Sequence, residues 1–590
     1  MPTGEQTTAS PGITHGGASG ITSRAIAATL GVIAAAFFTT SALVGIFTWA
    51  HPIPYWDMWD GYLSFWFQLQ DGNTAIWWEL SNEHHLILLK VLFWLDLVLF
   101  SGSNTFLLVI NIALLAVLIA LLAFLLRERL TGSLGSLKPL AGFVLLASVL
   151  AVIVTAWMQG EDLTIGYHAQ WLMIAAIPIS AFLFLGLTRK AGDVGNVRRA
   201  RRWFIAAIIM TALAPWAAAS GLVVPFVAAA LALAIGLGIA RAALLAGIGI
   251  VTAVIYLAGH PLLESSESTT GNVFSTPIQI VQFWILYLGG PWSRATDNQW
   301  LGGVAGVIFI LVVTYYVVHE LRSGNRSIFG LVAAAFPVFM LAMALLTAIG
   351  RIDFGLEQVN ALRYLTPMLS AWACLLIVAA PSLQQWFARG APLAFAAVLL
   401  VPVVLLPEQA SALTPPQANL QERDTATLAV ALGAPDSSVI IPVYPISTER
   451  PIELGARARE EGVGVFAREP YATIPATLGL PVIDKAAVSC AGWLDSRTPL
   501  EGSSWDRVDG WVVADGIPLS RGVLTLTDRN AQTIGWVATG KPRDDVLAEF
   551  PDASGLNGYS GYLDSSAASG DVYVAGESFR CSEPLISAVP

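Results

Sequence analysis

The residues whose types and spacing best suit chemistry follow the first long apolar stretch. This segment starts at His51 and reaches Trp56-Asp57-Met-Trp59-Asp60, so two carboxylates stand three positions apart among aromatic side chains. In a helix, that spacing places both carboxylates on one face. An acidic pair in such a setting suits general-base catalysis on a hydroxyl group. The alternative is a solvated loop whose tryptophans form a belt at the membrane surface.

A second polar cluster, Glu83-His84-His85, lies further along the same segment. It precedes residues 86–100, which form a predicted amphipathic or interfacial helix that carries Lys90. Histidine and carboxylate side chains can ligate a metal, but a lone histidine pair is weak evidence for a metal site, since third and fourth ligands are not obvious. The cluster therefore favours a contact with phosphate or sugar, and dependence on a divalent metal is left open.

Two later segments also combine polar and aromatic residues between apolar stretches. Residues 157–171 carry Glu161, Asp162, His168 and Gln170. Charged or amide groups at the mouth of a membrane helix are costly unless they face a cavity, so these four are candidate cavity residues. The alternative is a tight hairpin whose polar groups satisfy one another.

The segment 350–366 carries Arg351, Glu357, Arg363 and Tyr364. Arginine binds phosphate through a planar fork of donors, which suits a lipid-linked phosphate at the membrane surface. The alternative is an arginine that extends to the interface and pairs with a nearby carboxylate.

The elements that must position these residues are predicted to be membrane helices. The mean hydropathy is +0.66 and only 12% of residues are charged, against about 25% in soluble domains. Eleven apolar stretches approach the roughly 20 residues that a helical span needs. They are 24–50, 105–126, 139–157, 169–188, 203–219, 221–240, 242–258, 299–318, 328–349, 365–383 and 391–407.

Charge distribution predicts the orientation of this bundle. The polar residues 1–22 form a predicted disordered cytoplasmic leader, and the first apolar stretch is interpreted as a retained helix. The Lys- and Arg-rich loops fall on one side if the N-terminus is cytoplasmic. An odd number of spans then places the C-terminal tail outside the cytoplasm. Cys490 and Cys581 both lie in that tail, and an isolated pair in an oxidising compartment predicts one disulfide.

The chain thus divides into a membrane domain over 23–407, with an outward loop at 51–104, and a water-soluble tail. From Glu408 onward the tail has 24 acidic and 13 basic residues, which indicates a different solvent from the bundle. Residues 408–483 mix helix-like and strand-like pieces. Residues 484–590 alternate short strand-like runs with Gly and Asp turns, which predicts an extracytoplasmic β-sandwich.

Taken together, these features resemble the GT-C class of membrane glycosyltransferases, which take sugars from polyprenyl-phosphate carriers. Residues 56–60 stand where that class has an acidic motif near the end of the first helix. Glu83-His84-His85 is similar to a second motif of the same loop, although His85 stands where some members have a basic residue. The segments 159–162, 166–170 and 363–366 resemble pieces of uncharacterised bacterial membrane proteins of this type.

The resemblance implies roles for the polar residues. Asp57 and Asp60 would be catalytic, one as the base and the other orienting it or holding the acceptor. The implied contacts to the donor phosphate are Arg351, Arg363, His84, His85 and Lys90. The implied substrate contacts are Trp56, Trp59, Glu83, Glu161, Asp162, His168, Gln170, Glu357 and Tyr364.

The resemblance further implies a multi-pass protein of the bacterial cell (inner or plasma) membrane. Its partners would be the lipid bilayer, a polyprenyl-phosphate-linked sugar donor and a glycan or lipid acceptor, with no nucleic acid. Two alternatives remain: a transporter or flippase of lipid-linked glycans, and a non-catalytic envelope assembly factor. Transporters usually place ionisable residues near the membrane midplane, whereas here they cluster towards the outer surface, which favours the enzyme.

Overall fold

The computed structural model describes residues 16–81, 84–130, 137–258, 276–324, 326–389, 391–567 and 570–587. In this part of the chain, nine helices are long and apolar enough to cross a membrane. They are α1 (Gly16–Trp49), α4 (Thr105–Leu130), α5 (Leu137–Val154), α7 (Ala169–Asp193), α10 (Ile239–Leu257), α15 (Gln299–Arg322), α16 (Ile328–Arg351), α17 (Leu365–Ala388) and α18 (Pro392–Ser411). The predicted polytopic helical bundle is therefore confirmed. Residues 1–15 of the predicted leader lie outside the described part, and residues 16–22, also predicted to be disordered, belong to α1.

The two remaining predicted spans, 203–219 and 221–240, coincide with shorter helices. These are α8 (Val197–Leu213) and α9 (Val224–Ala234), separated by short 3-10 turns. Four arginines at the start of α8 shorten its apolar run, and the break after Leu213 shortens the next one. The shorter apolar stretch 277–291 forms α13 (Pro277–Leu288) and the start of α14 (Gly290–Thr296).

The bundle has a buried centre and an apolar exterior. Helices α7, α16 and α17 are largely enclosed, whereas no more than about a third of the apolar window is buried in α1, α4, α10, α15 and α18. On α15, for example, Leu311 and Val304 are exposed. A helix that is apolar all round and exposed on one side is suited to lipid contact.

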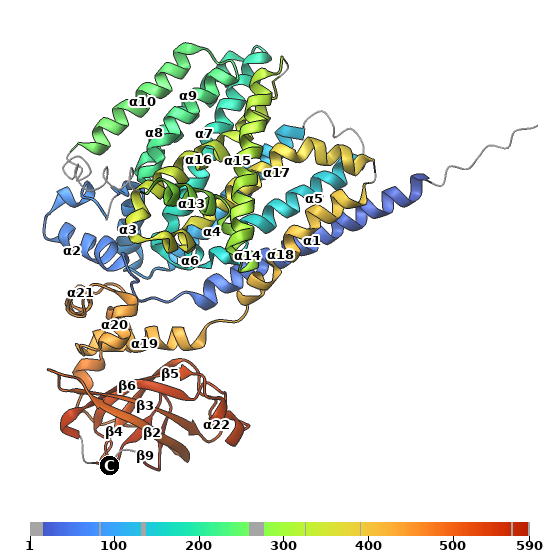
Figure 1. Ribbon diagram of the computed structural model, residues 1–590. Helices are drawn as coiled ribbons and strands as arrows, with labels where there is room; N and C mark the ends of the chain where they lie inside the picture. The colour runs from blue at the N-terminus through green and yellow to red at the C-terminus, as the bar shows by residue number, and fades with distance from the viewer. Residues whose placement is uncertain are drawn as a thin grey trace, which may run out of the picture.

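The two ends of the bundle differ in chemistry. At one end, basic side chains tie neighbouring loops together: Arg129 contacts Ser327, and Arg189 donates to the carbonyl of Gly236 at 3.0 Å. The opposite end carries the first long loop, the polar segment after α5 and the tail (Figure 1). The segments singled out for chemistry therefore share one end of the bundle.

The first loop is built from short helical pieces around a buried polar contact. It contains a π-helix, η1 (Trp59–Ser64), then α2 (Phe65–Gln70), η2 (Thr74–Trp77) and α3 (Ile87–Phe100). The hydroxyl of Tyr62 in η1 donates to the buried carboxylate of Asp96 in α3 at 2.5 Å. The helix predicted at 86–100 is therefore present, and it fixes the piece of loop that follows Asp57.

A layer of three helices separates the bundle from the C-terminal domain (Figure 1). These are α19 (Gln417–Leu432), α20 (Ser437–Val443) and α21 (Glu449–Glu460). The β-branched run at 438–445 lies within the region predicted to mix helix and strand, and it is helical over most of its length. The side chain of Asp436 accepts from the backbone N–H of Ser438 at 3.0 Å and so caps α20.

The C-terminal domain is β-rich, as predicted, and its strands join in one curled sheet with the order β1-β8-β7-β4-β5-β6-β3-β2-β9. The bounds are β1 (Ala486–Val488), β2 (Cys490–Pro499), β3 (Trp505–Ala514), β4 (Gly522–Thr527), β5 (Thr533–Lys541), β6 (Gly558–Asp564), β7 (Tyr573–Ala575), β8 (Phe579–Cys581) and β9 (Ile586–Ser587), with α22 (Asp544–Glu549) after β5. The predicted Cys490–Cys581 disulfide is present. It ties the start of β2 to the end of β8.

One face of this sheet packs on its own core and the other packs on α19. Val508, Val512 and Val537 lie in the domain core. Trp536 and Tyr562 instead join the cluster shared by α19 and the first loop. The β domain is therefore continuous with the helical layer that covers the first loop.

Candidate functional site

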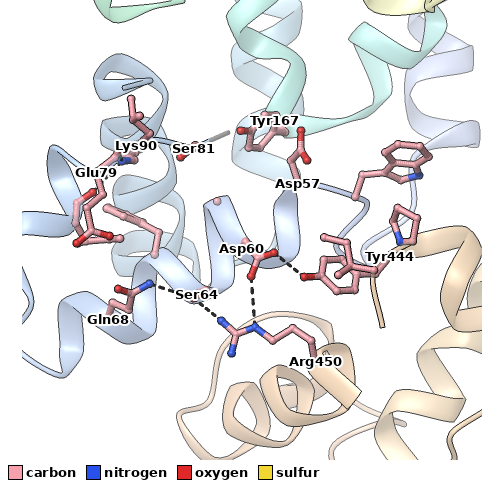
Figure 2. Close-up of a pocket in the computed structure, with 17 residues that line it drawn as sticks. Asp57, Asp60, Ser64, Gln68, Glu79, Ser81, Lys90, Tyr167, Tyr444 and Arg450 are labelled. Atoms are coloured by element: carbon pink, nitrogen blue, oxygen red, sulfur yellow. Dashed lines mark hydrogen bonds and ion pairs between the residues drawn. The ribbon is translucent and has the colours of Figure 1, made fainter. Parts of the chain in front are cut away.

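A cavity of about 260 Å³ lies between the first loop, the start of the segment before α7, and the tail. Figure 2 shows its polar side chains converging from these three parts of the chain. Its labelled lining residues are Asp57, Asp60, Ser64, Gln68, Glu79, Ser81, Lys90, Tyr167, Tyr444 and Arg450, and Trp56 also lines it. Both carboxylates of the acidic pair therefore face one cavity.

The tail holds the carboxylate of Asp60. The hydroxyl of Tyr444 donates to Asp60 Oδ2 at 2.8 Å, and Arg450 Nε lies 3.4 Å from Asp60 Oδ1. The same guanidinium donates to Ser64 Oγ at 2.9 Å. Burial, followed by the neighbouring Asp60 carboxylate, raises the pKa of Tyr444 to about 12, so Tyr444 remains a donor at neutral pH. Asp60 is thus a fixed part of the cavity wall.

Asp57 is exposed and its environment differs from that of Asp60. Within the described part of the chain, its carboxylate accepts no hydrogen bond and forms no ion pair, whereas its backbone carbonyl accepts from Gly61 N–H at 2.7 Å. Figure 2 shows the side chain directed towards Tyr167. A carboxylate that is anchored through its backbone but has free oxygens is the better placed of the two to accept a proton from a ligand.

The residue before Asp57 has an unusual backbone. Trp56 adopts a φ of 50°, in the left-handed region that large side chains avoid. Its N–H donates to the carbonyl of Val443 in α20 at 2.8 Å, so the tail helps to hold this conformation. Trp59 has a different position from the one expected of a substrate contact, because it is fully buried against Phe466. Trp56 faces the cavity and Trp59 belongs to the core.

The basic residues expected to hold phosphate in this loop have structural partners. Lys90 Nζ donates to the carbonyls of Ile76 at 2.8 Å and Glu79 at 2.6 Å. Burial lowers its pKa from 10.5 to about 8, and Glu79 opposes this effect. Lys90 therefore lines the cavity and also holds the backbone of Ile76 and Glu79, which line it too.

The histidine motif lies away from the cavity lining. The two ring nitrogens of His85 contact the carbonyls of Trp78 and Tyr256, so His85 links the loop to α10. His84 is not among the residues that line the cavity. Glu83 lies outside the described residues.

The polar residues after α5 form a second, buried cluster. His168 Nδ1 lies 2.9 Å from the fully buried Asp162, and Nε2 lies 3.9 Å from Glu161. The hydroxyl of Thr366 lies 2.7 Å from both Asp162 Oδ2 and Gln159 Oε1. This cluster joins the segment after α5 to the start of α17, and its polar groups largely satisfy one another. Gln170 is buried beside it at the start of α7.

The late segment 350–366 reaches this second cluster rather than the Asp57 cavity. The guanidinium of Arg363 lies over the ring of Tyr364 at 5.3 Å, and that of Arg351 over Phe354 at 5.5 Å. Neither arginine lines the cavity. Tyr364 is buried, and Glu357 is exposed on a short 3-10 turn.

Sequence patterns did not indicate the tail residues that complete the cavity. Tyr444 is 384 positions from its partner Asp60, so no local spacing connects them. The only hint in the sequence is chemical, since a carboxylate pair needs hydrogen-bond donors. The tail supplies two, Tyr444 just after α20 and Arg450 near the start of α21.

Among the residues that the structure describes, no group of three or more His, Cys, Asp or Glu side chains is arranged to hold a metal ion. No protein-family model, curated protein or solved structure matches this chain.

Proposed function

We propose that this protein is a membrane glycosyltransferase that moves a sugar from a polyprenyl-phosphate carrier to a glycan or lipid acceptor. The observation that carries the proposal is the carboxylate of Asp57, which has no hydrogen-bond or ion-pair partner among the described residues and faces a cavity of aromatic and polar side chains at one end of an apolar helical bundle. At about 260 Å³ the cavity lies near the lower end of the roughly 300–1,000 Å³ range of ligand pockets, which suits a small ligand group such as one sugar.

In the proposed reaction, Asp57 removes the proton from an acceptor hydroxyl as that oxygen attacks the anomeric carbon. The bond from this carbon to the carrier phosphate breaks, and the phosphate leaves with the electron pair. A single displacement of this kind inverts the anomeric centre. Asp60, held by Tyr444 and Arg450, positions the acceptor and keeps the cavity in shape.

The proposed topology follows from the two ends of the bundle. The basic end faces the cytoplasm of a bacterial cell, and the end with the cavity and the disulfide faces the oxidising exterior. Helices α8 and α9 would bring the number of crossings to eleven. Gly236, just after α9, accepts a hydrogen bond from Arg189 at the basic end, so α9 leads the chain back to that end. The C-terminal β domain, in a sandwich-like form, would hold the glycan acceptor.

Substituting Asp57 tests this proposal. In proteoliposomes supplied with a polyprenyl-phospho-sugar, Asp57→Asn should lower the transfer rate by about 10²-fold or more, the usual contribution of a general base. Asp71→Asn is the matched control, because Asp71 is an exposed carboxylate of the same loop that pairs with Arg457 outside the cavity. Transfer at the wild-type rate by Asp57→Asn would exclude the mechanism. No consumption of any lipid-linked sugar by the wild-type protein would exclude the enzyme.

A second candidate function is transport of a lipid-linked glycan. The buried Asp162–His168 pair favours it, because ionisable groups enclosed among membrane helices often line a transport path. A flipping assay with a fluorescent lipid-linked sugar distinguishes the two. A transporter would lose flipping activity in Asp162→Asn and keep it in Asp57→Asn. An enzyme would lose sugar transfer in Asp57→Asn and keep it in Asp162→Asn.

A further inference from the structure

A second cavity, of about 330 Å³, lies on the other side of the segment that carries Asp57. It is formed where α1, the segment after α5, α14, α18 and α19 meet. Tyr55 lines this second cavity, whereas Trp56 and Asp57 line the first. The two cavities are therefore neighbours with separate linings.

Four charged residues line the second cavity, and two of them neutralise each other. Arg294 Nε lies 3.1 Å from Glu408 Oε1, so this pair has little charge left for a ligand. The other two are Arg423 and Glu161.

Arg423 is a half-buried cation without a carboxylate partner within the described part of the chain. Its guanidinium lies over the ring of Tyr55 at 4.3 Å. Glu161 is partly exposed, and its ion-pair contact is with His168 at 3.9 Å, beyond hydrogen-bond distance. One positive and one negative group thus face the same space without bridging each other.

Such an arrangement is complementary to a ligand that carries both charges. A desolvated cation attracts an anion such as phosphate and forms charge-assisted hydrogen bonds with it. A carboxylate attracts an ammonium group in the same way. Because the cavity has balanced charge, a zwitterion fits it better than an anion or a cation alone.

The position of the cavity fits the depth of a lipid headgroup. Trp49 ends α1 and Trp157 follows the end of α5, and both line the cavity, as tryptophan does at a membrane interface. Phe47 on α1 and Leu406 on α18 are exposed apolar side chains close to those ends, as lipid chains require. We propose that this cavity binds the phosphoethanolamine head of a membrane phospholipid, with the phosphate on Arg423 and the ammonium on Glu161.

This proposal goes beyond sugar transfer and does not depend on it. It is tested on the purified full-length protein in detergent, by native mass spectrometry with phosphatidylethanolamine, phosphatidylcholine and phosphatidylglycerol. Phosphatidylethanolamine should bind about tenfold or more tightly than the other two, because only it offers both a phosphate and a hydrogen-bonding ammonium.

Three variants assign the contacts. Arg423→Gln should weaken phosphatidylethanolamine binding about tenfold or more, and Arg423→Lys should restore part of it because the charge is kept. Glu161→Gln should abolish the preference over phosphatidylcholine. Arg580→Gln is the matched control, because Arg580 lies over Tyr573 at 4.9 Å in the β domain, away from the cavity.

Thermal unfolding in lipid-free detergent shows whether each variant is folded. Equal binding of the three lipids by the wild-type protein would overturn the proposal, as would a preference for phosphatidylglycerol. Unchanged phosphatidylethanolamine binding by a folded Arg423→Gln variant would also overturn it.

Discussion

The buried Lys90 gives the most quantitative prediction, because its environment sets the sign and size of a pH effect. The residue is 2% exposed, and its ammonium group donates to the carbonyls of Ile76 and Glu79 beside the cavity. Burial lowers its pKa from 10.5 to about 8. Between these pH values the unfolded chain holds a proton on this lysine that the folded chain has released. The free energy of unfolding must therefore rise with pH through this window.

The magnitude follows from the same shift. Each tenfold change in proton affinity corresponds to about 1.4 kcal/mol, so the full effect is about 3 kcal/mol above pH 10.5. Most of it lies above pH 8, and between pH 7 and pH 9 the expected gain from Lys90 is about 1.3 kcal/mol.

Lys90→Met isolates this contribution, because other titrating groups are common to both proteins. Denaturant unfolding in detergent is measured for the wild type and Lys90→Met at pH 7, 8 and 9. The wild-type protein should gain stability relative to Lys90→Met as the pH rises. A difference that stays flat or falls with pH would refute the account of Lys90 as a buried, charged donor at neutral pH.

Three further predictions concern the tail and the cavity wall. Asp436→Ala should weaken docking of the β domain by about 1–3 kcal/mol, since it removes the 2.8 Å partner of the half-buried Arg507, which keeps only Asp509 at 3.4 Å. Limited proteolysis of the tail measures this effect, and unchanged protection would contradict it. Replacing Cys490 and Cys581 together by serine should destabilise the β domain by about 3–5 kcal/mol, because the disulfide closes a loop across 91 positions. Thermal unfolding of the wild type with and without reductant measures the same contribution, and identical unfolding curves in the two conditions would contradict it. Asp60→Asn should cost less than about 1 kcal/mol of stability because its ion pair is exposed, but should raise the KM for the acceptor several-fold; an unchanged KM would remove its positioning role.

Much of the architecture could be predicted because a bilayer imposes a minimum length on apolar helices. That rule identifies α1, α4 and seven other helices directly. It is less decisive for α8, where four arginines occupy the first turns and reduce the apolar length. The disulfide was also predictable, since the tail contains only two cysteines.

Other features could not be predicted because tertiary contacts decide them. The β-branched run 439–441 favours a strand, yet the cap from Asp436 and the burial of Val439 and Ile440 make it a helix. The partners of Asp60 come from α21 and the residue after α20, which no local pattern connects to the first loop. Likewise, the burial of Trp59 and the carbonyl contacts of His85 depend on how the loop folds over the bundle.

The acidic pair has one feature that the sequence predicts and one that only tertiary contacts decide. The sequence pattern places Asp57 and Asp60 together but cannot distinguish their roles. The contacts of Asp60 with Tyr444 and Arg450, and the free carboxylate of Asp57 within the described residues, separate a wall residue from a candidate base.

The most direct test of the central proposal is single-turnover transfer from a polyprenyl-phospho-sugar by wild-type protein, Asp57→Asn and Asp57→Glu in the same membrane preparation. The account predicts a fall of about 10²-fold or more in the rate for Asp57→Asn, with partial recovery for Asp57→Glu because a carboxylate is restored. Equal rates for wild type and Asp57→Asn would contradict it.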